Sequence, residues 1–367
     1  MKFFFVGSSS GQGGAETHFV ALAQALIGAD HSVSAAVRPD TYLSEQLDAV
    51  GVRTYSLRLR NSLDVSSYRM LAGIFRRENP DLLLSNFGRD YWPLIALGKC
   101  LRIPVSIFRH RVGRLKSFSN FALPRLAQHF FAVSEYARKI YLGYGMPADC
   151  VRVMYNPVDT RRYRPDAERG RRIRRSLNIS KDALVVGYCG RLIENKGIFV
   201  LKQALDLAMA VEPRLHCIWV GGGVEERRLR EETSVTAYAR QHHFTGLVDD
   251  VYDYYNAFSM LAFPSLAPEA FGRVSIEAQA CGVPVIGSDI GGIPETMHTS
   301  VSGMLVAPGD AQAWCDAILK MCNADIREPM SDAGRSFVDC NFSTGVIAHE
   351  MVSLLETDLS GMARAMR

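Results

Sequence analysis

Short apolar runs alternate with helical segments along this chain, and this alternation constrains the fold more than any other feature. Between the apolar runs lie stretches such as Glu16–Ile27, in which apolar residues recur at helical spacing. Strands that are apolar on both faces and alternate with helices predict parallel sheets covered by helices on both sides. The first half contains six predicted strands: Phe3–Val6, Val33–Val37, Leu82–Ser85, Val105–Phe108, Phe130–Val133 and Val151–Met154.

The alternation is interrupted once, at Asn156–Ser180, which is polar, rich in arginine and contains two prolines. We interpret this segment as an interdomain connection. We therefore predict an α/β fold with two doubly wound parallel-sheet domains, residues 1–165 and 166–345. Residues 346–367 are predicted to form a helix that packs back on the first domain. The alternation resumes after the connection with predicted strands at Leu184–Cys189, Leu215–Val220, Met260–Phe263 and Val285–Ser288.

Composition excludes several classes of protein. No apolar run reaches the ~18 residues that span a bilayer, and the run Phe3–Val6 is too short for a signal peptide. The eight cysteines form no C-x-x-C pair and the nine histidines show no metal-ligand spacing. We therefore expect buried thiols in a reducing cytoplasm and no metal site.

Charge is distributed unevenly along the sequence. Residues 1–180 hold 27 Lys and Arg against 14 Asp and Glu, whereas the remainder holds 15 against 24. This asymmetry favours a polyanionic surface as a partner of the first half, and a merely solvated basic face is the alternative.

Loops that follow strands are where parallel α/β sheets bind ligands. Three of them are rich in glycine: Gly7–Glu16, Gly190–Gly197 and Val220–Glu226. The first opens a helix, and its backbone N–H groups suit an anion, but it lacks the last glycine of a dinucleotide fingerprint. The second carries Arg191 and Lys196, which together can bind a diphosphate.

The stretch "PEAFGRVSIEAQACGVPVIGSD" places Glu269 in a loop and Glu277 in the helix that Gly272 and Arg273 begin. A carboxylate accepts hydrogen bonds from a diol, so each glutamate could bind paired hydroxyl groups. Backbone N–H groups near Phe271 would face an anion. A diphosphate that joins a ribose to a hexose would satisfy all these groups, which indicates a nucleotide sugar.

The same residues carry a resemblance to a known family. The segments "GRLIENKG", "VGGG", "FTGLVDDVYDYY", "PSLAPEAFGRVSIEAQACGVPVIGSDIGGIPE" and "GMLVAPGD" occur in order between about residues 184 and 310. They resemble the family 4 retaining glycosyltransferases of the GT-B fold, of the type that builds bacterial cell-surface glycans or lipopolysaccharide. The first half matches less densely, through "GGAETHFVALAQAL", "IPVSIFRH" and "NPVD", the last in place of the common "NGVD".

The resemblance implies two Rossmann-like domains that face each other across a cleft, and a hexose donor, with a UDP-sugar favoured. It implies that Glu277 holds the donor ribose and that Glu269 lies near the donor sugar. Arg191 and Lys196 would stabilise the departing diphosphate without a metal or other cofactor, and the chain lacks a D-x-D motif. The implied catalytic set is His110, Arg191, Lys196 and Glu269. The implied donor-binding set is Gly13, Gly14, Arg191, Lys196, Gly221, Leu247, Phe271, Gly272, Arg273 and Glu277.

Four alternatives differ in what they require. A glycoside hydrolase would use two carboxylates but would not need Arg191, Lys196 and the glycine loops. A nucleotide-sugar epimerase of the same fold would need no acceptor. The imperfect glycine pattern disfavours a dehydrogenase. A non-catalytic nucleotide-sugar-binding relative would be expected to lack Arg191, Lys196 or Glu269, and all three are present.

The acceptor is the least determined partner. Phe108–Phe131 interleaves basic and aromatic residues, which suits an anionic membrane surface. No recognition motif supports nucleic acid. We expect a glycan or lipid-linked acceptor, and a cytoplasmic protein bound peripherally to the inner face of the membrane.

Overall fold

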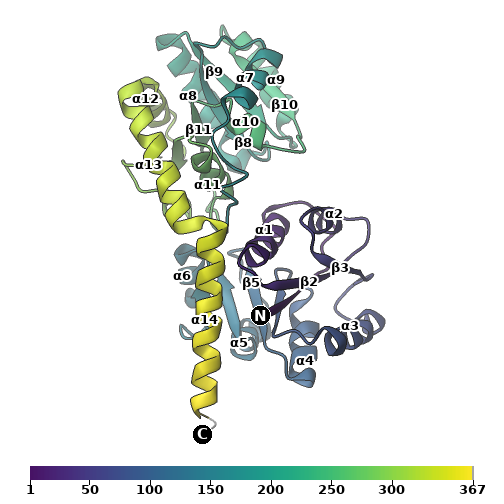
Figure 1. Ribbon diagram of the computed structural model, residues 1–367. Coiled ribbons are helices and arrows are strands. Elements are labelled where there is room, and N and C mark those ends of the chain that lie inside the picture. The colour runs from purple at the N-terminus through teal and green to yellow at the C-terminus, as the bar shows by residue number, and fades with distance from the viewer. Residues whose placement is uncertain (366–367) are drawn as a thin grey trace. The chain divides into compact units, whose positions relative to one another are not determined.

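The structure is a computed structural model that describes residues 1–365, with side-chain burial described to residue 357 (Figure 1). Two compact units are present. The first comprises Met1–Asp159 together with the C-terminal segment from Phe342, and the second is Thr160–Asn341. The boundaries expected from the sequence were at residues 165 and 345.

The first unit is a seven-stranded parallel sheet in the order β3-β2-β1-β4-β5-β6-β7. The chain moves outward from β1 in one direction through β2 and β3, then returns to β4 on the other side, which is the doubly wound pattern. The strands are β1 (Lys2–Gly7), β2 (Ser32–Val37), β3 (Arg53–Ser56), β4 (Leu82–Ser85), β5 (Val105–Arg109), β6 (His129–Ala132) and β7 (Val151–Val153). The helices are α1 (Gly14–Gly28), α2 (Tyr42–Ala49), α3 (Val65–Glu78), α4 (Tyr91–Leu101), α5 (Ser117–Leu126), α6 (Glu135–Gly143) and α14 (Thr344–Ala365).

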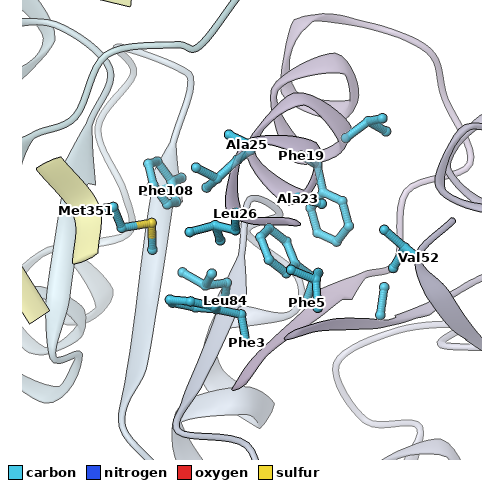
Figure 2. Packing of buried hydrophobic residues seen from close by; sticks show 14 of the residues in the cluster. Phe3, Phe5, Phe19, Ala23, Ala25, Leu26, Val52, Leu84, Phe108 and Met351 are labelled. Carbon is cyan, nitrogen blue, oxygen red and sulfur yellow. The ribbon is translucent and has the colours of Figure 1, made fainter. Parts of the chain in front are cut away.

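Helix α14 belongs to the core of this unit although it is the last element of the chain. Its residues Ile347, Ala348 and Met351 are fully buried in the same cluster as the β1 phenylalanines and the apolar face of α1. Figure 2 shows Met351 beside Phe108, with Phe3, Phe5 and Leu26 nearby. The backbone also attaches the start of this segment, since Val158 N donates to Phe342 O at 2.8 Å.

The second unit is a six-stranded parallel sheet in the order β10-β9-β8-β11-β12-β13. Its strands are β8 (Leu184–Cys189), β9 (Leu215–Val220), β10 (His242–Gly246), β11 (Met260–Phe263), β12 (Val285–Ser288) and β13 (Gly303–Val306). Its helices are α7 (Ala167–Ser176), α8 (Ile198–Val211), α9 (Glu226–Ser234), α10 (Tyr252–Tyr255), α11 (Arg273–Ala280), α12 (Ala311–Cys322) and α13 (Ala324–Phe342), with a short 3₁₀ helix η1 (Glu194–Lys196).

Three of the observed strands were not predicted from the sequence, namely β3, β10 and β13. Each is the outermost strand of its sheet. Their sequences RTYS, HHFTG and GMLV are short, and most of their residues are only partly buried or exposed. An edge strand has a neighbour on one side only and is less covered by helices, so its sequence carries a weaker apolar signal.

The predicted interdomain connection contains a helix of the second unit. Helix α7 carries five of the arginines of this segment, and several of them are paired. Arg169 and Arg172 both contact the carboxylate of Asp253 in α10. Gly170 packs so closely on that region that a Cβ atom there would lie 2.0 Å from Asn256 O.

The charge asymmetry therefore changes once the units are known. The first unit holds 21 Lys and Arg against 15 Asp and Glu, and the second holds 21 against 23. The first unit is therefore less basic than the first 180 residues, because eight arginines between positions 161 and 175 belong to the second unit.

No helix among the described residues is long and apolar enough to cross a membrane. All eight cysteines are free thiols. Cys189, Cys217, Cys281 and Cys315 are buried, but Cys100 and Cys340 are exposed. The prediction of buried thiols is therefore wrong for those two.

Candidate active site

The loop after β8 is held tightly against the loop after β11. Gly197 adopts φ +71°, and a Cβ atom there would lie 1.8 Å from Pro264 O, so only glycine fits without displacing backbone. Leu266 N donates to Asn195 O at 2.9 Å. These contacts bring the end of η1, with Lys196, beside the segment that carries Glu269.

Lys196 and Glu269 form an ion pair, Nζ to Oε1, across 73 positions of sequence. Ser265 Oγ donates to the same carboxylate oxygen at 2.7 Å. Both charged side chains remain about one-fifth exposed, at 22% and 23%. The pair is thus held in place by its neighbours while a ligand still has access to it.

Glu277 is held by two donors and lies almost completely inside the unit. Arg273 Nη2 lies 2.7 Å from Oε1, and Tyr255 Oη donates to Oε2 at 2.9 Å. The Glu277 side chain is 6% exposed and that of Arg273 12%. The prediction that Gly272 and Arg273 begin the helix with Glu277 inside it is confirmed, since Gly272 is the N-cap and α11 starts at Arg273.

The tyrosines around Glu277 remain protonated donors at neutral pH. Burial, together with the charge of Glu277, raises the pKa of Tyr255 and of Tyr163 well above the usual value. A hydroxyl group that keeps its proton can donate to the carboxylate, so Tyr255 fixes the orientation of Glu277.

Glycines allow other loops at this edge to approach one another. Gly221 has φ +123°, and a Cβ atom there would lie 2.1 Å from Gly190 O. Gly291 has φ +66°, and a Cβ atom there would lie 2.6 Å from Glu269 N. Gly292 N donates to Glu269 O at 2.9 Å. The loops after four strands therefore converge on one small region of backbone.

Two further predicted residues lie at this edge without such restraint. Arg191 is exposed and makes no ion pair within residues 1–365, although its carbonyl oxygen accepts from Tyr188 Oη at 2.7 Å. Leu247, after β10, is 85% exposed. Phe271 differs from both because it is buried.

His110, Gly13 and Gly14 belong to the first unit. His110 follows β5, and its ring centroid lies 4.5 Å from that of His18 on α1. His18 is fully buried, and its Nδ1 accepts from Asn86 Nδ2 at 3.0 Å. Gly13 is the N-cap of α1 and Gly14 its first residue, and both are exposed.

The sequence interpretation missed several residues that shape these sites. Tyr255, Ser265, His18 and Asn86 each contact a predicted residue or its neighbour. Tyr255 and His18 lie inside the segments that carried the family resemblance, but nothing in their local spacing distinguishes them from core residues. Among the described residues, no group of three or more His, Cys, Asp or Glu side chains could hold a metal ion.

Family models match both halves of the chain. "Glycosyltransferase Family 4" matches residues 12–162, and "Glycosyl transferases group 1" matches residues 170–337. The chain therefore belongs to the family 4, group 1 glycosyltransferases.

Curated relatives match over about half of the chain. A D-inositol 3-phosphate glycosyltransferase of Saccharomonospora viridis is 30% identical over 52% of this chain and 47% of its own length. The capsular polysaccharide biosynthesis glycosyltransferase CapM of Staphylococcus aureus is 32% identical over 48% of this chain and 47% of its own. The chain thus spans about half the length of the curated relatives it matches.

Solved structures share the fold over nearly the whole chain. HepE of Anabaena in complex with UDP has a TM-score of 0.84 at 22% identity, covering 97% of this chain and 100% of that one. A glycosyltransferase from Rickettsia africae has a TM-score of 0.85 at 21% identity, covering 98% of both chains. The fold is GT-B, with two Rossmann-like parallel-sheet domains.

Proposed function

We propose that the protein is a retaining glycosyltransferase that moves a hexose-type sugar from a UDP-sugar to a hydroxyl group of a glycan or lipid-linked acceptor. The observation that carries this proposal is the arrangement of Lys196, Glu269 and Glu277 at the carboxyl edge of the second sheet. Ligands of such sheets bind at that edge. A cation paired with one carboxylate, and a second carboxylate held separately on the helix that follows, suit a diphosphate flanked by two sets of sugar hydroxyls.

Glu277 is the proposed ribose ligand. Arg273 and Tyr255 occupy one position on each of its oxygens, and a carboxylate has about four acceptor positions. The remaining positions can accept the two hydroxyl groups of a ribose. Because its neighbours already fix the carboxylate, little ordering is needed when the donor binds.

Lys196 and Arg191 are the proposed diphosphate ligands. When the bond between the sugar C1 and the β-phosphate oxygen breaks, negative charge builds on that phosphate, and cations held beforehand stabilise it without a metal. The acceptor oxygen forms its bond to C1 on the same face. The acceptor proton passes to the departing phosphate, which balances the reaction.

Glu269 and His110 are the proposed contacts of the donor sugar. Glu269 Oε2 makes no hydrogen bond within the described residues, since Lys196 and Ser265 both contact Oε1. That second oxygen is available for a sugar hydroxyl. Gly13 and Gly14 are also proposed donor contacts, because neither carries a side chain that would keep a ligand from the backbone.

The choice of UDP rests on a fold neighbour. The solved structures of HepE of Anabaena include complexes with UDP and with UDP-glucose. HepE is 22% identical to this chain, and a likeness at that level supports a shared fold. That this chain binds UDP is therefore our proposal. The relative named for capsular polysaccharide biosynthesis supports a role in building a cell-surface glycan, and we place that role in the cytoplasm as part of the proposal.

We also propose that the protein binds peripherally to an anionic membrane. Phe118 and Phe121 on α5 are 71% and 58% exposed, and the exposed Arg125 on the same helix lies over the Phe121 ring. Exposed aromatic side chains next to cations suit shallow insertion at a lipid headgroup layer. Replacing Phe118 and Phe121 with serine should release the protein from vesicles that contain phosphatidylglycerol.

A donor-hydrolysis screen tests the main proposal. Purified protein is incubated with UDP-, GDP- and ADP-sugars, with and without excess EDTA, and release of the nucleoside diphosphate is measured. We expect release from a UDP-sugar that EDTA leaves unchanged. Release from none of the donors, together with no measurable binding of any nucleoside diphosphate, would contradict the proposal, and a strict metal requirement would contradict the metal-free diphosphate site.

A further inference from the structure

Six exposed cations follow three strands of the first sheet. They lie in the loops after β3, β4 and β5, and all of these loops leave the carboxyl edge of a parallel sheet. That edge is where sheets of this kind bind their ligands. We call this set the basic strip: Arg58, Arg60, Arg89, Arg111, Arg114 and Lys116.

The loops of the basic strip contact one another, although β3 and β4 are not neighbours in the sheet. Ser62 Oγ, in the loop after β3, donates to Arg89 O at 2.6 Å. This bond brings the loop with Arg58 and Arg60 across two intervening strands to the loop after β4. The first three cations therefore lie along one continuous stretch of surface.

A second contact continues the strip to the loop after β5. The Trp92 ring, at the start of α4, stacks on the Phe118 ring at the start of α5 with centroids 5.4 Å apart. Trp92 Nε1 also donates to Ser119 Oγ at 2.9 Å. Arg89 shortly precedes Trp92 and Lys116 shortly precedes Phe118, so these contacts hold the two cationic loop ends near each other.

The cations of the strip are almost entirely without acidic partners. Within residues 1–365 only Arg60 makes an ion pair, with Asp64 at 3.6 Å. Most hydrogen-bond acceptor positions of the Asp64 carboxylate are already used, because it accepts from Arg60 N, Ser66 Oγ and Ser67 Oγ. Asp90, the other acid in these loops, is fully buried and accepts from Ser8 N at 2.9 Å.

Cations elsewhere on the same sheet are arranged differently. Arg53, at the start of β3 and therefore at the opposite edge, pairs with Glu78 at 3.1 Å. Lys2 at the start of β1 has its backbone N–H bonded to Asp81 at 2.7 Å. The opposite edge thus mixes both signs of charge, whereas the exposed charges in the loops after β3, β4 and β5 are all positive.

The position of two strip residues also lowers the stability of the fold. Lys116 is the N-cap of α5 and makes no capping hydrogen bond with its side chain, and Arg89 directly precedes the N-cap of α4. A positive charge at a helix N-terminus is unfavourable because the macrodipole is positive there. Cations kept at such positions are expected to serve binding rather than stability.

We propose that the acceptor of this glycosyltransferase is an anionic glycan that carries phosphate or carboxylate groups on more than one sugar. The inference rests on the proposed function and names its acceptor class. Arginine binds both groups through paired hydrogen bonds. The four strand intervals from β3 to β5 span about 19 Å at ~4.8 Å each, so the strip is longer than one sugar.

Titration with two oligosaccharides tests the proposal. The probes are a heparin hexasaccharide, which carries carboxylates and sulfates, and maltohexaose, which is neutral, both with the nucleotide site saturated with UDP. We expect the wild-type protein to bind the heparin hexasaccharide at least ~10-fold more tightly, with an affinity that falls as salt rises, because exposed charges are screened.

A matched pair of triple variants locates the binding. One triple variant should bind the heparin hexasaccharide about tenfold more weakly than the wild-type protein; it combines Arg58→Ser, Arg89→Ser and Arg114→Ser. Lys99→Ser, Arg102→Ser and Lys139→Ser remove the same charge from exposed positions outside the strip and should change its affinity by less than about twofold. Urea denaturation of each variant reports whether its first unit is folded, and its UDP affinity reports on the second unit.

The outcomes separate the two proposals. If UDP binds but the two hexasaccharides do not differ, or both triple variants lose affinity equally, the anionic acceptor is overturned and the proposed function stands. If UDP does not bind while the strip still selects the heparin hexasaccharide, the proposed function fails. Binding to phosphatidylglycerol vesicles that depends on Arg58 and Arg89, without binding of the hexasaccharide, would assign the strip to a membrane and overturn the proposal.

Discussion

The two units treat charge in opposite ways at the carboxyl edges of their sheets. In the second unit Lys196 pairs with Glu269, and Glu277 is held by Arg273 and Tyr255. In the first unit five of the six strip cations have no acidic partner among the described residues. Paired and buried groups are oriented before a ligand arrives, whereas unpaired exposed cations adapt to it.

This difference indicates two modes of recognition. Preorganised groups in a shielded site interact strongly with the ligand and depend little on salt. Each exposed cation contributes only modestly to the binding free energy, and its charge is screened within about 8–10 Å at physiological salt. We therefore expect the second unit to select its ligand by geometry and the first by net charge.

The largest effect should come from the ion pair of the second unit. Lys196→Ala removes a proposed diphosphate ligand and leaves Glu269 without its cation, so turnover should fall by roughly 10²–10³. Steady-state release of UDP from the preferred donor measures it. Lys202→Ala is a suitable control, because Lys202 pairs with Asp206 on α8 and not with a predicted site residue. Near-normal turnover of Lys196→Ala would show that the pair is structural.

The substitution Glu277→Ala should have the second largest effect, a loss of UDP affinity. Loss of the carboxylate leaves Arg273 and Tyr255, and the ribose hydroxyls if bound, without an acceptor, so UDP affinity should fall by about 1–3 kcal/mol. Calorimetry with UDP measures the loss. Tyr255→Phe, which removes one donor to Glu277 and leaves the carboxylate, should cost less. An unchanged affinity in both variants would remove Glu277 from the donor site.

The two units should also respond oppositely to acid. Burial raises the pKa of Asp90 in the first unit to about 6, above its unfolded value of 3.8. The stabilising contribution of protonated Asp90 is therefore complete below pH 3.8 and lost as pH rises through 6. In the second unit, burial lowers the pKa of His216 and lowers that of His243 to about 4. Their contribution is complete above pH 6.5 and falls in acid, and that of His243 is lost as pH falls through about 4.

Hydrogen exchange resolved by peptide measures this contrast. Between pH 7.5 and 5, after correction for intrinsic rates, protection should rise around β1 and β4 and fall around β9 and β10. Asp90→Asn should abolish the rise, since the amide keeps the acceptor for Ser8 but does not ionise. Above pH 6 this variant should be more stable than the wild-type protein by roughly 1–3 kcal/mol. The same pH response in both units would refute the contrast.

The smallest effect should come from the surface pairs of α7. Asp253→Asn removes the carboxylate that Arg169 and Arg172 share, in side chains 41% and 59% exposed. Exposed pairs contribute about 0.2–1 kcal/mol each, so the free energy of unfolding should change by no more than about 1 kcal/mol. Urea denaturation checks this. A much larger loss would mean that α7 docks through Asp253 rather than through close packing at Gly170.

Much of the fold could be predicted from local pattern. Central strands such as β1, β8 and β11 are buried on both faces and therefore appear as continuous apolar runs. The edge strands β3, β10 and β13 could not be predicted in the same way, because pairing with a neighbouring strand stabilises them more than their own side chains do.

The sequence by itself determined the two α/β repeats, the start of α11 at Gly272 and Arg273, and the types of residue that could bind a nucleotide sugar. These follow from periodicity, backbone freedom and side-chain chemistry, which act over a few neighbouring residues. Only the tertiary structure decided that Lys196 pairs with Glu269, that Tyr255 holds Glu277, and which residues of α14 enter the first core. Each of these contacts joins residues far apart in the chain, and the packing of whole strands and helices brings them together.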